Sequence, residues 1–285
     1  MSSTEQHVGI TGASGVLGRA LVQSRDVAWH AFPGDIRSGA QLSDWLDGCP
    51  PLDAVFHLAA VVPTARVERE PKSAFDVNAG GTASLLEALR LRNASPWIFL
   101  ASTSHVYEAA MHPLDEDSPL RASSLYGASK LAAEEWARAV SRNGAMRLCI
   151  GRIFSYSAAV QDDSYVIPSL VTRIRNAPPG GRLEVAGFGS VRDFLAASDV
   201  AAAIRRLHET RSEGVFNIGS GNGCSIGELA RRLTEKLGRG DLRLEPIGTQ
   251  ASTIVADVGK IGQIGWHPTR SLDDLLDEVI AAHES

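Results

Sequence analysis

The sequence predicts an α/β fold, with a doubly wound parallel sheet and a smaller C-terminal lobe. Short apolar runs alternate with amphipathic, helix-like segments from His7 to about Ile153. No hairpin-type turn joins these runs, so we expect parallel strands with right-handed crossovers and helices on both faces. After Phe154 the alternation stops, which indicates that the remaining chain builds a separate, smaller lobe.

The predicted strands are short apolar runs bounded by turn or charged residues, and the predicted helices carry apolar residues at helical spacing. Strands are expected at His7–Thr11, Val27–Phe32, Ala54–Leu58, Trp97–Ser102 and Met146–Ile153. Helices are expected at Val16–Arg25, Gln41–Leu46, Lys72–Arg92 and Ser124–Arg142.

Beyond Phe154 the pattern is less regular. Ser155–Ser164 is polar and irregular, and Ala177–Arg182 carries a strong loop signal. Ser198 would cap the helix that it opens. The expected elements are helices at Pro168–Asn176, Ser198–Glu209, Ile226–Leu237 and Leu272–Ala282 and strands at Gly214–Ile218 and near Ile254–Ala256.

Composition and charge exclude several classes of protein. The chain has 285 residues, of which 44% are hydrophobic and 21% charged, as in globular rather than disordered, collagen-like or coiled-coil chains. Its net charge of −5 comes without a basic cluster, so no nucleic-acid or membrane surface is expected. Cys49, Cys149 and Cys224 are odd in number and lack metal-ligand spacing, which favours free thiols and no metal. Without a signal-like start or a long apolar run, the protein is expected in the cytoplasm.

A glycine-rich turn follows the first strand directly. Gly12, Gly15 and Gly18 lie in TGASGVLG, between a predicted strand and a predicted helix. The spacing suits a tight turn, a close backbone approach to a pyrophosphate and close helix–sheet packing. The alternative is an ordinary glycine-rich turn, but the strand–turn–helix context favours dinucleotide binding in a Rossmann-type domain.

The acidic residue that usually binds the adenosine ribose in such domains is not at its expected place. An acidic residue usually follows about 20 residues later, but the second strand ends at Ala31–Phe32 without one. Asp35 comes next and could contact the ribose or the adenine, or cap the following helix. Arg37 could reach a 2′-phosphate, although surface arginines are common. The choice between NAD and NADP therefore stays open.

Two groups of residues downstream could carry chemistry. Tyr126 and Lys130 are four residues apart in a predicted helix, so the phenol and the ammonium share one face. A nearby cation lowers the pKa of a phenol, which then exchanges a proton near neutral pH. Upstream, Ser102 and Thr103 end a buried strand, where α/β proteins place active groups; either hydroxyl could bind a substrate oxygen or satisfy the loop backbone.

Together these residues resemble the extended short-chain dehydrogenase/reductases, the NAD-dependent epimerase/dehydratase family of nucleotide-sugar enzymes. The resemblance covers nearly the whole chain and follows an ordered series of motifs. These are the glycine turn, Phe56–Ala60, Asn78–Thr82, the hydroxyl-ended strand, Tyr126 with Lys130, Ser190–Phe194, Asp199–Val200, Phe216–Gly221 and Gly265–Pro268.

The resemblance implies a role for each matching position. Thr103 would hold the substrate oxygen, Tyr126 would donate or accept the proton, and Lys130 would bind the nicotinamide ribose and lower the pKa of the tyrosine. Arg192 would meet the nucleotide diphosphate, with a structural salt bridge as the alternative, and Ser104 and His105 would lie by the substrate. The implied cofactor-binding residues, besides Tyr126 and Lys130, are Gly12, Ser14, Gly15, Val16, Leu17 and Gly18 around the pyrophosphate, Asp35 and Ile36 by the adenosine, and Leu58, Ala59 and Ala60 along the cofactor.

Departures from the family pattern narrow the reaction. In the family's 4,6-dehydratases an Asp-Glu pair follows the threonine, whereas this chain has Ser104 and His105, so dehydration is not expected. After the fifth strand the family often has Asn followed by Gly-Pro. Here Phe154–Ala159 replaces that sequence, which favours a shifted or unusual substrate.

The resemblance leaves three functions open. The first is an NAD(P)H-dependent ketoreductase acting on a nucleotide-activated keto sugar, with Tyr126 as proton donor. The second is an epimerase with tightly bound NAD, and the third a non-catalytic dinucleotide-binding protein. Family members often dimerise through helices that correspond to Lys72–Arg92 and Ser124–Arg142, so a homodimer is expected.

The motif order also divides the chain by function. Residues 1–155 together with about 190–220 would form the dinucleotide-binding domain. Residues of about 156–189 and 221–285 would form the substrate-binding lobe.

Overall fold

The structure, a computed structural model, describes residues 6–24, 27–62, 64–142, 146–248 and 251–283. The chain divides into two units, each with its own interior contacts. The first unit is Met1–Glu108, Pro119–Ile153 and Ala201–Phe216. The second unit is Ala109–Ser118, Phe154–Val200 and Asn217–Ser285. The segment predicted to return to the first domain, about 190–220, is longer than the Ala201–Phe216 segment that belongs to the first unit.

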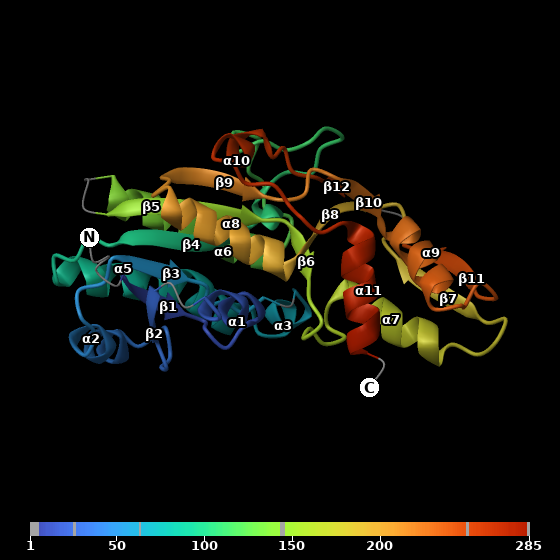
Figure 1. The fold of residues 1–285 in the computed structure, drawn as a ribbon, viewed down its shortest axis with the longest axis horizontal. Coiled ribbons are helices and arrows are strands. Elements are labelled where there is room, and N and C mark those ends of the chain that lie inside the picture. The colour runs from blue at the N-terminus through green and yellow to red at the C-terminus, as the bar shows by residue number, and fades with distance from the viewer. Residues whose placement is uncertain (1–5, 25–26, 63, 143–145, 249–250, 284–285) are drawn as a thin grey trace. The chain divides into compact units, whose positions relative to one another are not determined.

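A six-stranded sheet in the order β2-β1-β3-β4-β5-β9 forms the centre of the first unit (Figure 1). Every neighbouring pair from β2 to β5 is parallel. The strands are β1 (Gln6–Thr11), β2 (Val27–Ala31), β3 (Ala54–His57), β4 (Trp97–Thr103), β5 (Arg147–Ile153) and β9 (Gly214–Ile218). The helices are α1 (Val16–Val22), α2 (Gly39–Asp47), α3 (Thr64–Arg69), α4 (Pro71–Phe75), α5 (Gly81–Leu91), α6 (Leu125–Ser141) and α8 (Ala197–Glu209), with a π turn η1 (Asp76–Gly80) and a 3₁₀ turn η2 (Ser104–Val106).

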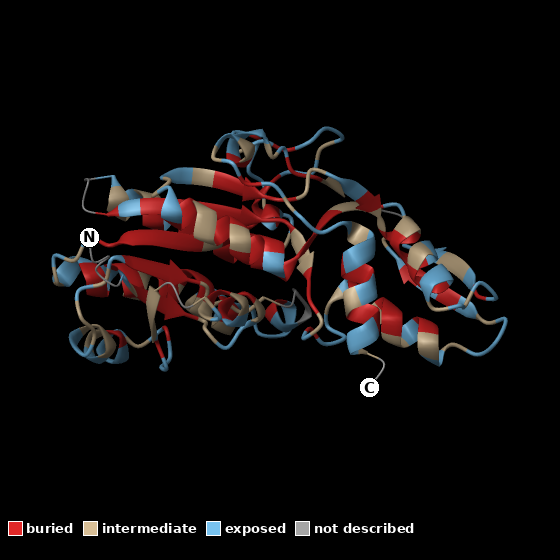
Figure 2. Cartoon of the chain, in the orientation of Figure 1, coloured by how far each residue is buried: buried red, intermediate tan, exposed pale blue. Residues whose placement is uncertain are grey.

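Helices cover both faces of this sheet. On one face α2, α5 and α6 pack side by side over apolar strand residues such as Val55, Ile98 and Leu148. Successive side chains of a strand point to opposite faces, so Phe56 points the other way, where its ring meets His208 of α8 at 5.3 Å. Figure 2 shows the central strands buried along their length, as two covered faces require. The prediction of a doubly wound parallel sheet is confirmed.

The second unit contains smaller sheets and a helical layer. Strand β8 (Val191–Ala196) pairs antiparallel with β10 (Gly223–Ser225) and parallel with β6 (Ser155–Ser157) and β12 (Thr253–Ile254). Strands β7 (Arg182–Ala186) and β11 (Arg243–Ile247) form a separate parallel pair. The helices are α7 (Val166–Asn176), α9 (Ile226–Lys236), α10 (Gly259–Gln263) and α11 (Leu272–Ala282). An apolar core joins α7, α9 and α11 to Phe194 of β8.

Several expected elements differ from the structure. The predicted helix Lys72–Arg92 is three pieces, because the π turn η1 interrupts it between α4 and α5. Ser198 lies inside α8, which begins at Ala197, so its predicted capping role is wrong. Ser155–Ser164, expected to be irregular, begins with β6, since pairing with β8 orders it. Arg25, the predicted end of the first helix, lies outside the described residues, and α1 ends at Val22.

Candidate functional site

The strand order places a change of direction between β1 and β3. From β1 the chain crosses to β2 on one side, and from β3 onward it continues on the other side. Ligands of doubly wound sheets bind outside the carboxyl ends of the strands at such a point. The residues that follow these two strands are the glycine turn after β1 and Leu58–Ala60 after β3, so the predicted cofactor residues lie where the topology favours a ligand.

The glycine turn has room only for glycine at two of its positions. Gly12 has φ +76°, and a Cβ there would lie 2.7 Å from the backbone nitrogen of Ala59. A Cβ on Gly18 would lie 2.3 Å from the carbonyl oxygen of Gly12. These contacts fold the turn tightly against β3 and against the first turn of α1.

The start of α1 is open toward a ligand. Gly15 is its N-cap and is exposed, and no side chain caps the helix. The first N–H groups of a helix have no partner within the helix. Ser14 is also exposed, Val16 is half-buried and Leu17 is buried, so the backbone rather than the apolar side chains faces outward. This cradle fits the pyrophosphate of a dinucleotide.

The residues after β3 are held against the same turn. The Leu58 N–H donates to the carbonyl oxygen of Thr11 at 3.1 Å. The Ala59 N–H donates to the Thr11 hydroxyl at 3.3 Å. Leu58, Ala59 and Ala60 are half-buried, so they form one wall beside the glycine turn.

Asp35 and Ile36 have different environments. Asp35 is exposed and accepts hydrogen bonds from Arg37, which lower the pKa of its carboxyl to about 2. The helix after it is capped by Ser38, whose hydroxyl accepts from the Gln41 N–H, so Asp35 does not cap that helix. Ile36 is buried and packs closely against Gly81. A Cβ added to Gly81 would lie only 2.6 Å from the Cγ2 atom of Ile36. The side chain of Ile36 is therefore part of the core.

Helix α6 positions the tyrosine and the lysine. Ser124 caps it by accepting from the Gly127 N–H at 3.1 Å. A Cβ on Gly127 would lie 2.2 Å from the carbonyl oxygen of His105, so glycine allows the helix start to pack tightly on η2. In this arrangement the Tyr126 ring meets the His105 ring edge-on at 5.6 Å. The His105 N–H donates in turn to the Thr103 hydroxyl at 3.3 Å. The structure thus brings the C-terminal end of β4 and the first turn of α6 together around His105.

Lys130 is a buried cation. It is 3% exposed. Burial lowers its pKa to about 8, and the Glu134 carboxylate opposes that shift. A buried lysine one turn from Tyr126 on the same helix fits the predicted contact with the hydroxyls of a nicotinamide ribose.

A buried ion pair lies one helical turn beyond Lys130. The Glu134 carboxylate accepts from Arg152 of β5 at 2.9 Å and from the Ser102 hydroxyl at 2.5 Å. Both charged residues are at most 1% exposed, and the Arg152 guanidinium lies 4.7 Å from the centre of the Tyr107 ring. Sequence reasoning did not identify this group, and it gave Ser102 a choice of roles. The Ser102 hydroxyl donates to Glu134 and so ties β4 to α6.

The remaining predicted substrate residues differ in exposure. Thr103 and Ser104 are buried at 5% and 3% exposure, whereas His105 is exposed. Arg192 lies in the second unit on β8. Its guanidinium donates to the carbonyl oxygens of Val191 and Ser252 and to the Ser252 hydroxyl, at 2.7 to 2.9 Å. Among the described residues Arg192 has no carboxylate partner, so the alternative of a structural salt bridge is not what the structure shows.

Its neighbour Asp193 has a structural position. This carboxylate is fully buried and accepts from the backbone of Ser220, Gly221 and Ala256 and from the Ser220 hydroxyl. The motif around Phe216–Gly221 therefore holds the loops after β9 and β12 to β8.

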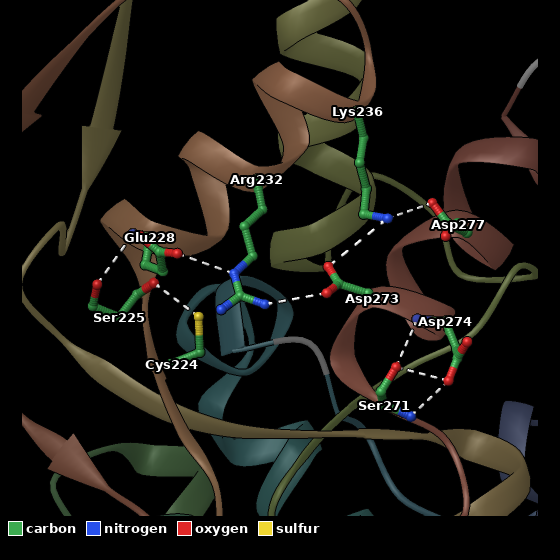
Figure 3. A network of polar contacts seen from close by, with 9 residues as sticks. All are labelled: Cys224, Ser225, Glu228, Arg232, Lys236, Ser271, Asp273, Asp274 and Asp277. Carbon is green, nitrogen blue, oxygen red and sulfur yellow. Dashed lines mark hydrogen bonds and ion pairs between the residues drawn. The ribbon is translucent and has the colours of Figure 1, made fainter.

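The second unit also has a cavity of about 620 Å³ near the starts of α9 and α11. Ion pairs join the two helices: Arg232 and Lys236 of α9 contact Asp273, and Lys236 also contacts Asp277 (Figure 3). Cys224 lines the cavity with its thiol directed at the Ser225 carbonyl. Of the charged residues in these ion pairs, Arg232 lines the cavity, and Glu228, which also lines it, accepts from Arg232 at 3.0 Å.

Metal ligands and membrane spans were also sought. In the described ranges, no three or more His, Cys, Asp or Glu side chains are grouped so that they could hold a metal ion. None of the helices described has both the length and the apolar character needed to cross a bilayer.

Comparison with known proteins identifies the family. The chain is 29% identical over 303 residues to the GDP-6-deoxy-D-mannose reductase of Pseudomonas aeruginosa, covering 98% of each chain. It is 27% identical to a UDP-glucose 4-epimerase of Streptomyces lividans, over 89% of this chain and 82% of that one. The solved structure of RMD from Pseudomonas aeruginosa complexed with NADPH superposes with a TM-score of 0.87, at 26% identity, covering 98% of this chain and 99% of that chain.

The model of the NAD dependent epimerase/dehydratase family matches residues 8–219, which include the glycine turn, Tyr126 and Lys130. The resemblance, the Rossmann-type fold and the dependence on a nicotinamide dinucleotide that the sequence predicts are thereby confirmed. The chain belongs to the NAD dependent epimerase/dehydratase family.

Proposed function

We propose that the protein is an NAD(P)H-dependent ketoreductase that acts on a nucleotide-activated keto sugar. The observation that carries the proposal is the grouping of Thr103, Tyr126 and Lys130 in the unit that also holds the glycine cradle. The reductase of Pseudomonas aeruginosa, similar over nearly the whole chain, supports reduction as the direction of the reaction. We assign the cofactor to the first unit and the sugar nucleotide chiefly to the second.

The residues of the chain would divide the chemistry among them. A nicotinamide cofactor, held by the glycine turn and Lys130, would supply the hydride for the keto carbon. Thr103 holds the oxygen of that carbon, and Tyr126 gives its phenolic proton to the same oxygen as the alkoxide forms. Lys130 binds the ribose, and its positive charge stabilises the phenolate left behind. A lysine that remains charged despite burial is needed for both tasks, and Glu134 favours that charge.

The substrate would carry a nucleoside diphosphate. Arg192 is half-buried, has its position fixed by backbone carbonyls, and keeps its charge free of any carboxylate among the described residues. Such a guanidinium fits a phosphate oxygen. Ser104 and His105 replace the carboxylate pair that dehydration would require, so the sugar is reduced rather than dehydrated.

The test is a reduction assay. Purified protein should oxidise NADH or NADPH when it is given 4-keto-6-deoxy sugar nucleotides, and the GDP, dTDP and UDP forms should differ in kcat/KM. The loss of reduced nicotinamide is followed by absorbance, and the product is identified by mass. No oxidation of either cofactor across the panel would contradict the proposal.

Epimerisation is the second candidate, because the Streptomyces lividans relative is a UDP-glucose 4-epimerase. The same tyrosine and lysine would then serve oxidation and re-reduction of one sugar hydroxyl. An epimerase should carry NAD through purification and convert a hydroxy sugar nucleotide without net change in cofactor. Released dinucleotide, identified after denaturation, separates the two functions and also decides between NAD and NADP.

We also propose that the protein forms a homodimer through α5 and α6. The leucines of α5 are mostly buried in the core, but Trp136 on α6 is 53% exposed and Leu91 at the end of α5 is 65% exposed. Aromatic residues are enriched at protein–protein interfaces, so an exposed tryptophan on α6 fits a contact there. Sedimentation should give twice the chain mass, and Trp136→Glu should shift the equilibrium toward monomer. A strict monomer of the wild-type chain would contradict the dimer.

A further inference from the structure

A row of buried polar side chains connects the glycine turn to helix α6. Its members come from β1, β3, η1, α5 and α6 and are all at most 1% exposed. They are Thr11, His57, Asn78, Thr82 and Ser129. The proposed reaction uses none of them. Burying polar groups is costly unless every group is hydrogen-bonded, so the arrangement needs an explanation.

Each neighbouring pair in this row is in contact. The Thr11 hydroxyl lies 2.7 Å from His57 Nδ1, and His57 Nε2 lies 3.0 Å from the Thr82 hydroxyl. Thr82 donates to the carbonyl oxygen of Asn78 at 2.7 Å. The Asn78 amide donates to the Ser129 hydroxyl at 3.0 Å, and Ser129 donates to the carbonyl oxygen of Tyr126 at 2.8 Å. The row therefore ends on the backbone of the proposed proton donor.

The π turn places Asn78 at the centre of the row. Its Oδ1 atom accepts from the Val61 N–H at 2.7 Å, and its Nδ2 atom donates to the Val61 carbonyl at 3.1 Å as well as to Ser129. Both hydrogens of the amide and one acceptor site of its oxygen are thereby used. An interrupted helix, which the sequence did not predict, is what presents this side chain to both neighbours.

The donors and acceptors fix the protonation of His57. The Thr82 hydroxyl gives its only hydrogen to Asn78, so it must accept from His57 Nε2, which therefore carries the proton. His57 Nδ1 is then an acceptor, and the Thr11 hydroxyl donates to it while accepting from the Ala59 N–H. A second proton would turn Nδ1 into a donor, so the Thr11 hydroxyl would have to accept there as well and its own hydrogen would lose its partner.

The surrounding charge acts in the same direction. Burial, followed by the nearby positive charge of Lys130, lowers the pKa of His57 to about 3. Lys130 on α6 is the charged group that acts on this ring among the described residues; Thr11, Thr82, Asn78 and Ser129 carry none. The histidine therefore stays neutral over the pH range in which the enzyme would work.

We propose that His57 is a positioning residue that, as the neutral Nε2–H tautomer, holds the glycine turn, the end of β3 and helix α6 in one fixed arrangement. The row would couple the cofactor cradle to Tyr126, so that loss of one link weakens cofactor binding and misplaces the phenol. The effect on turnover rests on the proposed function. The effects on the tautomer and on cofactor affinity do not.

The test combines NMR spectroscopy with cofactor titration. In protein labelled with ¹⁵N-histidine, the His57 ring should show the Nε2–H pattern and keep it at pH 5, where an unperturbed histidine would be mostly charged. Thr82→Val removes the acceptor and leaves a buried N–H unpaired, so the Kd for NAD(H) or NADP(H) should rise by about tenfold or more. Thr82→Ser keeps the hydroxyl and should restore the affinity.

The control is a second buried histidine of the same unit. His208 packs against Phe56 and Trp97, its Nε2 atom has no hydrogen-bond partner among the described residues, and burial lowers its pKa to about 4. His208→Phe should leave the Kd unchanged. An Nδ1–H or charged His57 at pH 5, a Thr82→Val protein with wild-type affinity, or equal losses in both variants would overturn the proposal. Inactivity toward every keto sugar, with these binding results intact, would count against the proposed function alone.

Discussion

Replacing Tyr126 by phenylalanine is expected to lower kcat by about two to four orders of magnitude, the usual contribution of a positioned acid or base. The ring should keep its place, because it packs against Val67 and Ala74 and meets His105 edge-on. What is lost is the hydroxyl that gives its proton to the new alkoxide. Since Lys130 and the glycine cradle are untouched, the Kd for the dinucleotide should stay within about twofold of wild type.

Steady-state kinetics with the keto substrate and a fluorescence titration of the cofactor measure the two quantities separately. The matched control is Tyr165→Phe. Tyr165 is half-buried and precedes α7 in the second unit, so this variant should keep the wild-type dinucleotide affinity and a much higher kcat than Tyr126→Phe. A Tyr126→Phe enzyme with more than half of the wild-type kcat would remove Tyr126 from the reaction. It would favour a binding protein on this fold, because fold alone does not dictate catalysis.

The residues of the cofactor cradle could be predicted because their signals are local in the sequence. Gly12 and Gly18 are needed where the turn folds back on itself, and the strand and helix on either side are visible in the apolar pattern. Tyr126 and Lys130 lie one turn apart on one helix, so a fixed spacing brings them to one face. Helices α9 and α11 were likewise visible, because their apolar faces repeat over several turns.

The parts that the sequence did not predict depend on distant partners. Strand β8 was missed because its order comes from pairing with β6, β10 and β12, of which only β12 overlaps a strand expected from the sequence, near Ile254–Ala256. The π turn could not be predicted because the contacts that stabilise it, those of Asn78 with Val61 and Ser129, join residues that are far apart in the sequence. His57 was visible only as part of a motif, and nothing local indicates that threonines lie on both sides of its ring.

The ion pair of Glu134 with Arg152 could be predicted only in part. Glu134 follows Lys130 by four residues, so a carboxylate near the ammonium was predictable from helical spacing alone. That Arg152 and Ser102 meet the same carboxylate depends on β4 and β5 lying beneath α6, which only the fold determines. The role of Ser102 was left open for the same reason.

Glu134→Gln is expected to have the largest effect on stability, lowering the free energy of unfolding by about 3 to 5 kcal/mol. Glu134 and Arg152 are both buried, so the variant leaves the guanidinium charged in a place with no water to solvate it. Urea unfolding followed by circular dichroism measures the loss. Glu135→Gln is the matched control. Its carboxylate is 54% exposed on the same helix and pairs with Arg138, which also contacts Glu134, and the change should cost no more than about 1 kcal/mol.

A double variant, Glu134→Leu with Arg152→Met, separates the charge from the packing. Replacing both members of a buried pair by apolar groups of similar size is often neutral, so part of the stability should return. The Ser102 hydroxyl loses its acceptor, which limits the recovery. The pH profile of activity should still differ from that of the wild type, because the Glu134 carboxylate opposes the fall in the pKa of Lys130. Without the Glu134 carboxylate, the pKa of Lys130 should fall below about 8. As the pH is raised, kcat should therefore begin to decline at a lower pH than in the wild-type enzyme. If the double variant recovers both stability and the wild-type pH profile, Glu134 serves the fold alone and Lys130 keeps its charge by other means.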